Sequence, residues 1–211
     1  MTSTIRCGRP RKGEEALRRD LLLEQAMHLF AEYGYGALSL ETIARRAHVS
    51  LRTIYRHFGG KAQLFGAVIE RISDEFVASL PQDASRPLAE VLEEFGCQFI
   101  SRIARPECLR LYAQILAEAQ RFPELAAQFY RCGPERTLTH LSHLLAEYQR
   151  VGILAGFDSR LLAGQFLATL RGEWLRKLEL GLAAPLGQRA LREQVKQVVN
   201  LFLRGCLICD Y

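Results

Sequence analysis

A short run of polar and cationic residues between Ser50 and Lys61 carries the side chains best suited to binding a nucleic acid. Ile54 and Phe58 fall on one face of a predicted short helix. The other face holds the side chains that point outward: Arg52, Thr53, Tyr55, Arg56 and His57. Such groups can hydrogen-bond base edges and phosphates in a DNA major groove, whereas they are poor core material. We therefore expect this helix to bind DNA.

A second short helix precedes it and is expected to hold it in place. The apolar residues of this first helix share one face at helical spacing: Leu40, Ile43, Ala44 and Ala47. Ser39 and Ser50 stand where N-caps are expected, and only His48 and Val49 separate the two helices. Two short helices joined by so tight a turn indicate a helix-turn-helix.

The excess positive charge of the chain lies in its N-terminal part. Residues 1–61 contain eleven Lys and Arg against six Asp and Glu, whereas residues 62–211 contain seventeen of each sign. Clustered cations release counterions from a polyanion, which favours a nucleic acid as the partner. An anionic membrane surface is the rival, but this segment lacks a long amphipathic helix with an unbroken apolar face.

The sequence Arg9-Pro-Arg11 has two interpretations of equal weight. An extended Arg-Pro-Arg fits a narrow A·T-rich minor groove, whose negative potential attracts arginine. A solvated basic tail explains the same residues. We treat Arg9 and Arg11 as candidate DNA contacts within a basic arm, residues 1–15.

Length and composition indicate a folded protein. With 211 residues, of which 49% are hydrophobic, the chain can bury one or two cores. Residues 1–12 lack the apolar region of a signal peptide, and no apolar run approaches the roughly 18–20 residues of a membrane span. We expect a cytoplasmic protein without a membrane partner, whose six cysteines are reduced.

Helical periodicity, interrupted by Gly and Pro, predicts an all-α protein without an internal repeat. The domains expected are a helix-turn-helix DNA-binding domain at 16–62, a connecting helix at 63–80, and a ligand-binding and dimerisation bundle at 81–211. Pro81 to Pro87 marks the boundary. The helices expected beyond the helix-turn-helix region lie at about 87–104, 107–120, 123–131, 135–151, 158–181 and 188–207.

The last two predicted helices each carry a broad apolar face. These faces supply the expected dimer interface: Leu167, Leu170, Leu178, Leu191, Val195, Val198, Val199 and Phe202. Two such helices either cover their own core or form half of a four-helix bundle with a second copy. A single helix-turn-helix reads few bases, and twofold symmetry is the usual remedy, so we favour a homodimer.

Several aromatic side chains are spread over the C-terminal helices and are candidates for a ligand pocket: Phe95, Phe99, Tyr112, Phe129, Tyr148, Phe166 and Trp174. Pockets between the helices of a bundle are largely apolar, which suits a lipophilic effector. Aromatic residues at helical spacing are more often core, and this alternative stays open for each of them.

Cys206 and Cys209 form a Cys-x-x-Cys pair near the end of the chain. No second pair lies at zinc-ligand spacing. His140 and His143 lie in adjacent turns of one predicted helix without a convergent carboxylate near them in the sequence, so we expect no metal. Most cysteines should be small buried residues. The alternative is a thiol switch in which oxidation of Cys206 and Cys209 releases DNA. No catalytic motif is present, so neither an enzyme nor a cofactor is expected.

Residues 22–69 resemble the DNA-binding domain of the TetR family of bacterial transcriptional regulators. The motifs that carry the resemblance are Ala26-x-x-Leu-Phe30, Gly34-Tyr-Gly36, Leu40-x-x-Ile-Ala44, Ala47-His-Val-Ser50, Thr53-Ile-Tyr-Arg-His-Phe58 and Lys61-x-x-Leu-Phe65. The C-terminal part resembles AcrR-like members with an AefR-like domain, through Glu118 to Leu125 and Phe129 to Pro134. His48 departs from the glycine usual at the turn, and Ala62 from the acidic residue common after the lysine.

The resemblance implies a homodimer in which each subunit presents its helix-turn-helix to one half of a palindromic operator. It places these residues in the recognition helix or at its start: Ser50, Leu51, Arg52, Thr53, Tyr55, Arg56 and His57. Arg52 is then best suited to a bidentate contact with guanine, and Leu51 to a thymine methyl group. Tyr55 and His57 are suited to phosphates.

Three residues around the recognition helix complete the expected DNA contacts. Thr42 should meet the DNA backbone, Lys61 should add a cation to the amide donors of its helix, and His48 is a possible extra contact. The resulting hypothesis is a repressor released from its operator by a lipophilic or aromatic effector. The alternatives are a cysteine-based sensor of the same type and, in another class, a helical enzyme or small-molecule-binding protein without a DNA site.

Overall fold

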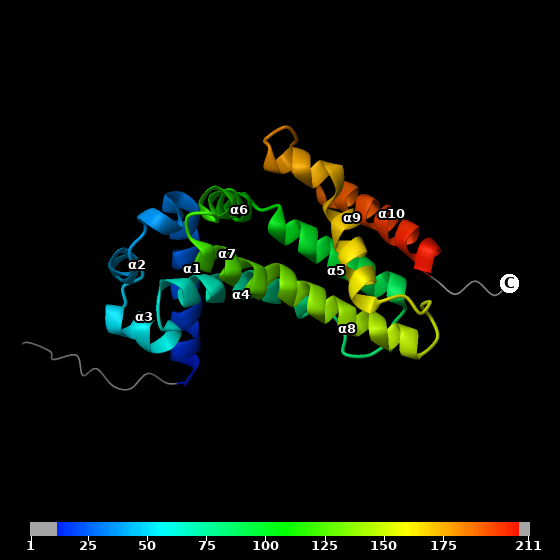
Figure 1. Cartoon of the computed structure of the whole chain (residues 1–211), viewed down its shortest axis with the longest axis horizontal. Coiled ribbons are helices and arrows are strands. Elements are labelled where there is room, and N and C mark those ends of the chain that lie inside the picture. The colour runs from blue at the N-terminus through cyan, green and yellow to red at the C-terminus, as the bar shows by residue number, and fades with distance from the viewer. Residues whose placement is uncertain (1–11, 207–211) are drawn as a thin grey trace, which may run out of the picture.

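The computed structural model describes residues 12–206 and the side chains of 17–205, and this part of the chain is helical without a β-strand (Figure 1). The all-α prediction is confirmed. The helices are α1 (Lys12–Ala37), α2 (Leu40–Arg46), α3 (Leu51–Phe58), α4 (Lys61–Val77), α5 (Leu88–Ile103), α6 (Pro106–Glu118), α7 (Pro123–Tyr130), α8 (Arg136–Arg150), α9 (Ser159–Glu179) and α10 (Gln188–Cys206).

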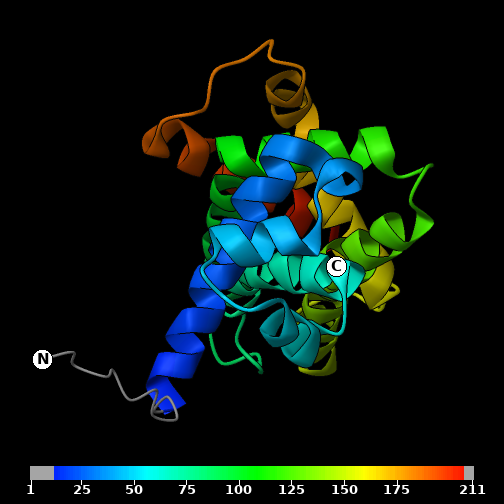
Figure 2. The ribbon, with the colours of Figure 1, turned by 90° about the vertical axis from the view of Figure 1, so that its left-hand side faces the viewer.

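We call α1–α3 the head and α5–α10 the body, with α4 running from one to the other. Figure 2, seen from the head end, shows α2 and α3 beside the long α1, in front of the helices of the body. α2 and α3 are short, with 7 and 8 residues, and one side of α3 faces solvent. Helices this short enclose little apolar core by themselves.

The structure has two hydrophobic cores, and the core of the head extends into the body. The core of the head includes Phe30, Ile54 and Phe65, and it is closed by Leu111 and Ile115 of α6. The core of the body extends along α4 from Phe76 onward and includes residues on both sides of segment 81–87. The change from one core to the other thus occurs within α4, and segment 81–87 belongs to the body.

The predicted helix break at Gly133-Pro134 is wrong. Residues Arg131–Glu135 form a π-helical turn that joins α7 to α8, and the flanking residues keep right-handed helical dihedral angles. A proline inside an α-helix lacks an N–H donor and clashes with the carbonyl four residues earlier. The wider π turn relieves this clash, so the helix continues through Pro134.

The predicted helix 158–181 forms, but it bends sharply. Gly172 has φ 48° and ψ −167°, which interrupts α9 (Figure 1). A positive φ is accessible to glycine at little cost because glycine has no Cβ atom. The segment after the bend therefore takes a direction of its own, and this matters for the cavity described below.

Candidate functional site

Two serines cap the helices of the helix-turn-helix, Ser39 at the start of α2 and Ser50 at the start of α3. Ser39 accepts a hydrogen bond from the Thr42 N–H at 3.2 Å, and Ser50 accepts one from the Thr53 N–H at 3.0 Å. His48 lies between them with φ 54°, in the left-handed region that asparagine, aspartate and histidine tolerate best among non-glycine residues. The predicted caps are confirmed.

The recognition helix α3 is anchored on one side and exposed on the other. Ile54 is fully buried, and Leu51, Thr53 and Phe58 are partly buried. The exposed residues of the turn and the helix are His48, Ser50, Arg52, Tyr55, Arg56 and His57. One Arg56 terminal nitrogen lies 3.1 Å from His57 Nε2. The exposed side of α3 thus presents cations and hydrogen-bonding groups together, as DNA recognition requires.

Some predicted DNA contacts have other partners. The Ser50 and Thr53 hydroxyls lie 2.8 Å apart, and those of Ser39 and Thr42 3.2 Å apart, so these groups already serve the caps. The Lys61 ammonium lies 4.4 Å from the centre of the Tyr35 ring. Its burial lowers the pKa of Lys61, although nearby carboxylates act in the opposite direction.

Two further cations were not singled out from the sequence. Arg45 and Arg46 are exposed in the last turn of α2, directly before the turn that leads to α3. They could have been found from the sequence, because they occupy the positions opposite the apolar face of that helix. Arg9 and Arg11 lie outside the described residues.

The body contains an apolar cavity of about 360 Å³ between α4, α5, α6, the α7–α8 region and α9. Three predicted pocket residues line it: Phe99, Tyr112 and Phe129. The other four do not line this cavity: Phe95, Tyr148 and Phe166 are fully buried core residues, and Trp174 packs against the same core. Their helical spacing was equally compatible with core and pocket, and here the core alternative holds.

The polar groups of the cavity are few. On one side, Ser73 donates hydrogen bonds to backbone carbonyls and accepts one from Arg136 at 2.8 Å, and Thr137 donates to the Gly133 carbonyl. These hydroxyls already have protein partners. On the other side, Arg171 and Glu179 line the cavity 3.6 Å apart, and the Arg171 guanidinium lies 5.5 Å from the centre of the Tyr112 ring.

The end of α6 holds the head. The Glu118 carboxylate accepts hydrogen bonds from the Tyr35 N–H at 2.6 Å and from the Gly36 N–H at 3.1 and 3.2 Å. These amides follow Gly34, whose φ of 77° interrupts α1. We call this contact the head clasp. Its residues come from helices that are far apart in the sequence, so no local pattern reveals it.

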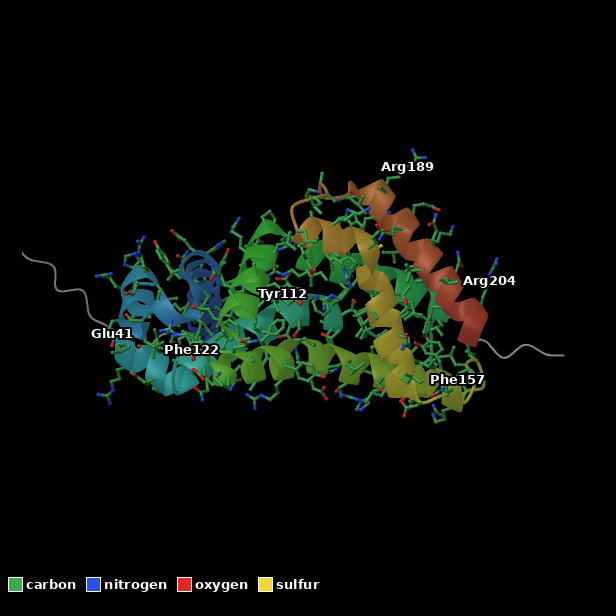
Figure 3. The ribbon with its side chains drawn as sticks, turned by 45° about the horizontal axis from the view of Figure 1, so that its top comes forward. Glu41, Tyr112, Phe122, Phe157, Arg189 and Arg204 are labelled. Carbon is green, nitrogen blue, oxygen red and sulfur yellow. The ribbon has the colours of Figure 1, made fainter. Side chains whose placement is uncertain are left out.

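Aromatic packing surrounds the head clasp. The Tyr35 ring lies 5.4 Å from that of Phe122, and Figure 3 shows Phe122 where the head meets the body. Burial raises the pKa of Tyr35 to about 12, with a further contribution from the Glu124 carboxylate. Tyr35 is therefore un-ionised at neutral pH, as its buried position requires.

The predicted dimer faces point mostly into the chain itself. Leu170, Leu178, Leu191, Val195 and Val199 are buried, and Leu167, Val198 and Phe202 pack against the body core. The sequence pattern could not distinguish a core from an interface, since both need the same apolar faces. Large apolar side chains that remain exposed on α9 and α10 are Leu161 and Leu201.

The described cysteines are poor nucleophiles. Burial raises the pKa of the Cys97, Cys108 and Cys132 thiols, which disfavours the reactive thiolate at neutral pH. The side chain of Cys206 and all of Cys209 lie outside the described residues. Within the described part of the chain, no cluster of His, Cys, Asp and Glu could hold a metal ion, and no helix is long and apolar enough to cross a membrane.

Two family models together match most of the chain. The model of bacterial regulatory proteins of the tetR family matches residues 22–68, which include α2 and α3. The model of the AefR-like transcriptional repressor C-terminal domain matches residues 90–205, more than half of the chain.

Individual relatives agree with these matches. The HTH-type transcriptional regulator BetI of Rhizobium meliloti is 27% identical over 93% of this chain and 94% of its own. The structure of the flavonoid-responsive regulator FrrA is 32% identical, with a TM-score of 0.71 over 91% of this chain and 98% of that chain.

A further solved structure shows the same fold. It is a TetR-family regulator from Mesorhizobium loti with a TM-score of 0.76 and 23% identity, covering 92% of this chain and 98% of its own. The expectation that the chain is not an enzyme agrees with all of these relatives. The helix-turn-helix head, the helical body and both family matches lead to one conclusion: this chain belongs to the TetR family of DNA-binding transcriptional regulators, with an AefR-like C-terminal domain.

Proposed function

We propose that the protein is a homodimeric repressor that binds a palindromic operator through α3 and leaves it when a lipophilic or aromatic effector occupies the body cavity. The observation that carries this proposal is the position of α6. This helix lines the cavity with Leu111, Tyr112 and Ile115, and its last residue, Glu118, holds the head.

The geometry supplies a route from cavity to head. Leu111 and Ile115 line the cavity and also belong to the core of the head. An effector that pushes on α6 would therefore disturb both this core and the head clasp. The effector can release DNA only if it binds more tightly to the dimer whose head positions do not fit the operator. Equal affinity for the fitting and the non-fitting arrangement would leave the equilibrium between them unchanged.

The relatives support the chemical class of the effector. The flavonoid-responsive regulator FrrA is similar over 91% of this chain, and its name indicates a response to flavonoids. The cavity is walled mainly by aliphatic and aromatic side chains and is within the size range of small-molecule pockets, about 300–1,000 Å³. Leu161 and Leu201 support an interface with a second copy through the exposed sides of α9 and α10.

Footprinting of the intergenic DNA upstream of the protein's own gene tests the proposal. We expect a protected palindrome whose protection is lost on addition of at least one compound from a panel of flavonoids and other lipophilic molecules. The salt concentration must be stated, because phosphate contacts make affinity strongly salt-dependent. Protection that no compound alters, but that oxidant abolishes, would favour the Cys206 and Cys209 switch. The absence of any protected site would contradict repression at this locus.

Gly164→Leu should block the cavity. A Cβ atom at Gly164 would lie 3.9 Å from Leu138 Cδ1, so a side chain fits there and extends toward the cavity. Replacing an interior helix glycine also favours the helix by up to about 1 kcal/mol. We expect unchanged or slightly higher thermal stability, together with at least about tenfold weaker effector binding, measured by calorimetry. Gly164→Ala is the matched control and should bind the effector nearly normally.

Tyr55→Ala should weaken binding to all DNA sequences alike. Tyr55 is exposed on α3, where its hydroxyl can reach a phosphate, and phosphate contacts position the protein without specifying sequence. We expect a loss of about 1 kcal/mol, roughly fivefold, for operator and for unrelated duplex. Fluorescence anisotropy with both duplexes measures it. A loss confined to the operator would instead make Tyr55 a base-reading residue.

A further inference from the structure

The bend of α9 creates an ion pair on the cavity wall. Arg171 lies directly before Gly172, and Glu179 lies in the segment after it, yet their side chains approach to 3.6 Å. Eight residues of straight helix would separate the two backbones by about 12 Å along the axis. The bend at Gly172 therefore brings together the two charged side chains of the cavity lining.

The two partners of this pair are held differently. Arg171 belongs to the straight part of α9, whose side chains Ala163, Phe166 and Leu170 are buried in the body core. Its guanidinium also rests against the Tyr112 ring of α6. Glu179 belongs to the segment after the bend, which Leu175 and Leu178 anchor in the core, and its described contact in the cavity is the ion pair itself. Arg171 is thus the charge held by a second contact, and a rotation of the Glu179 side chain is enough to break the pair.

A ligand carboxylate can take the place of Glu179. The pair is partly exposed, with side-chain exposures of 41% and 27%, and such pairs contribute little net stability. A carboxylate on a ligand can meet the Arg171 guanidinium in bidentate geometry, in place of the 3.6 Å contact with Glu179, and the apolar part of the ligand gains the burial that the cavity provides. A cationic ligand would have to approach the fixed guanidinium, and a neutral one would leave the ion pair in place.

We propose that the effector is a lipophilic organic acid whose carboxylate binds Arg171 by displacing Glu179. This rests on the proposed ligand-binding role of the cavity and narrows its ligand to one chemical class. The segment that carries Glu179 also carries Trp174, the single tryptophan of the chain, whose indole N–H donates to the Ala184 carbonyl at 3.3 Å. Binding of the acid should therefore change the environment of this tryptophan.

Three probes with one apolar body test the proposal: cyclohexylbutanoate, cyclohexylbutanol and cyclohexylbutylammonium. None absorbs where tryptophan is excited, so calorimetry and Trp174 emission can be measured on the same full-length protein. We expect the acid to bind at least about tenfold more tightly than the alcohol or the amine, which corresponds to about 1.4 kcal/mol. Only the acid should shift the Trp174 emission.

Variants of the two charged residues give opposite expected results. Arg171→Gln should remove the advantage of the acid while leaving alcohol binding unchanged, which also shows that the variant is folded. Glu179→Gln removes the competing carboxylate and should tighten acid binding several-fold. The matched control is Arg176→Gln, since Arg176 is an exposed residue of the segment after the bend and lies outside the cavity lining. This change should alter neither the affinity for the acid nor its advantage over the alcohol.

The outcomes separate this inference from the function on which it rests. Equal binding of the three probes, or an acid preference that survives Arg171→Gln, would overturn the organic-acid class and leave a ligand cavity standing. Tighter binding of the amine, weakened by Glu179→Gln, would assign the cavity to cations instead. Failure of all three probes to bind would overturn the ligand-binding role of the cavity itself.

Discussion

Arg52→Ala is expected to reduce operator affinity by about ten- to a hundredfold while leaving binding to unrelated duplex DNA only slightly weaker. Arg52 is exposed in the first turn of α3, where residues of a recognition helix reach base edges. A bidentate arginine contact with guanine contributes about 1–3 kcal/mol of discrimination, which sets this range. Binding titrations with the operator and with a scrambled duplex at one salt concentration measure the ratio.

The matched control for Arg52 is Arg45→Ala. Arg45 is an exposed arginine in the last turn of α2, so it shares the charge but not the position on α3. Its removal should lower the affinity for both duplexes by the same factor. It should also make the affinity less dependent on salt concentration, as expected for the loss of a phosphate contact. If Arg52→Ala also lowered the affinity for both duplexes equally, Arg52 would be a phosphate contact and its base-reading role would be refuted.

Glu118→Ala is expected to lower the free energy of unfolding by about 2 kcal/mol and to loosen the head. The Glu118 carboxylate accepts from two backbone amides of the head, and hydrogen bonds to charged groups contribute about 1.5–3 kcal/mol. Both amides remain partly accessible to water, which keeps the expected loss near the lower end. A fall of about 5 °C in the midpoint of thermal unfolding corresponds to this change.

The functional effect of Glu118→Ala separates the head clasp from ordinary stability. A head that is no longer fixed spends part of its time in positions in which the two heads cannot bind both half-sites at once. Affinity for the full operator should therefore fall more than affinity for a single half-site. Glu124→Gln is the control, because Glu124 interacts with the Tyr35 side chain and not with these amides, and glutamine keeps a hydrogen-bonding group there. Equal losses for the full operator and the half-site would show that the clasp only stabilises the fold.

The sequence was sufficient for the local structure of the head. Ser39 and Ser50 cap their helices, Ile54 is buried, and Arg52, Tyr55 and Arg56 are exposed, as helical spacing predicts. These features depend on residues within one or two turns of each other. Periodicity and capping preferences report such short-range relations directly.

Contacts between residues far apart in the sequence could not be predicted from periodicity or capping preferences. The contact of Glu118 with Tyr35 spans 83 residues, and no local signal marks it. Phe95 and Phe99 are four residues apart on α5, yet only Phe99 lines the cavity, because lining depends on which helices lie opposite. The effect of Pro134 was overestimated, since a π turn can absorb a proline that would break a regular helix.

The shared core of the head has a consequence for how such regulators can be recombined. Leu111 and Ile115 close the core around Phe30 and Phe65, so a head transplanted onto an unrelated body would leave this apolar surface in water. A working chimaera has to carry matching α6 and α7 residues along with the new head. The unit of this chain that can be exchanged is therefore the head together with its docking surface on α6.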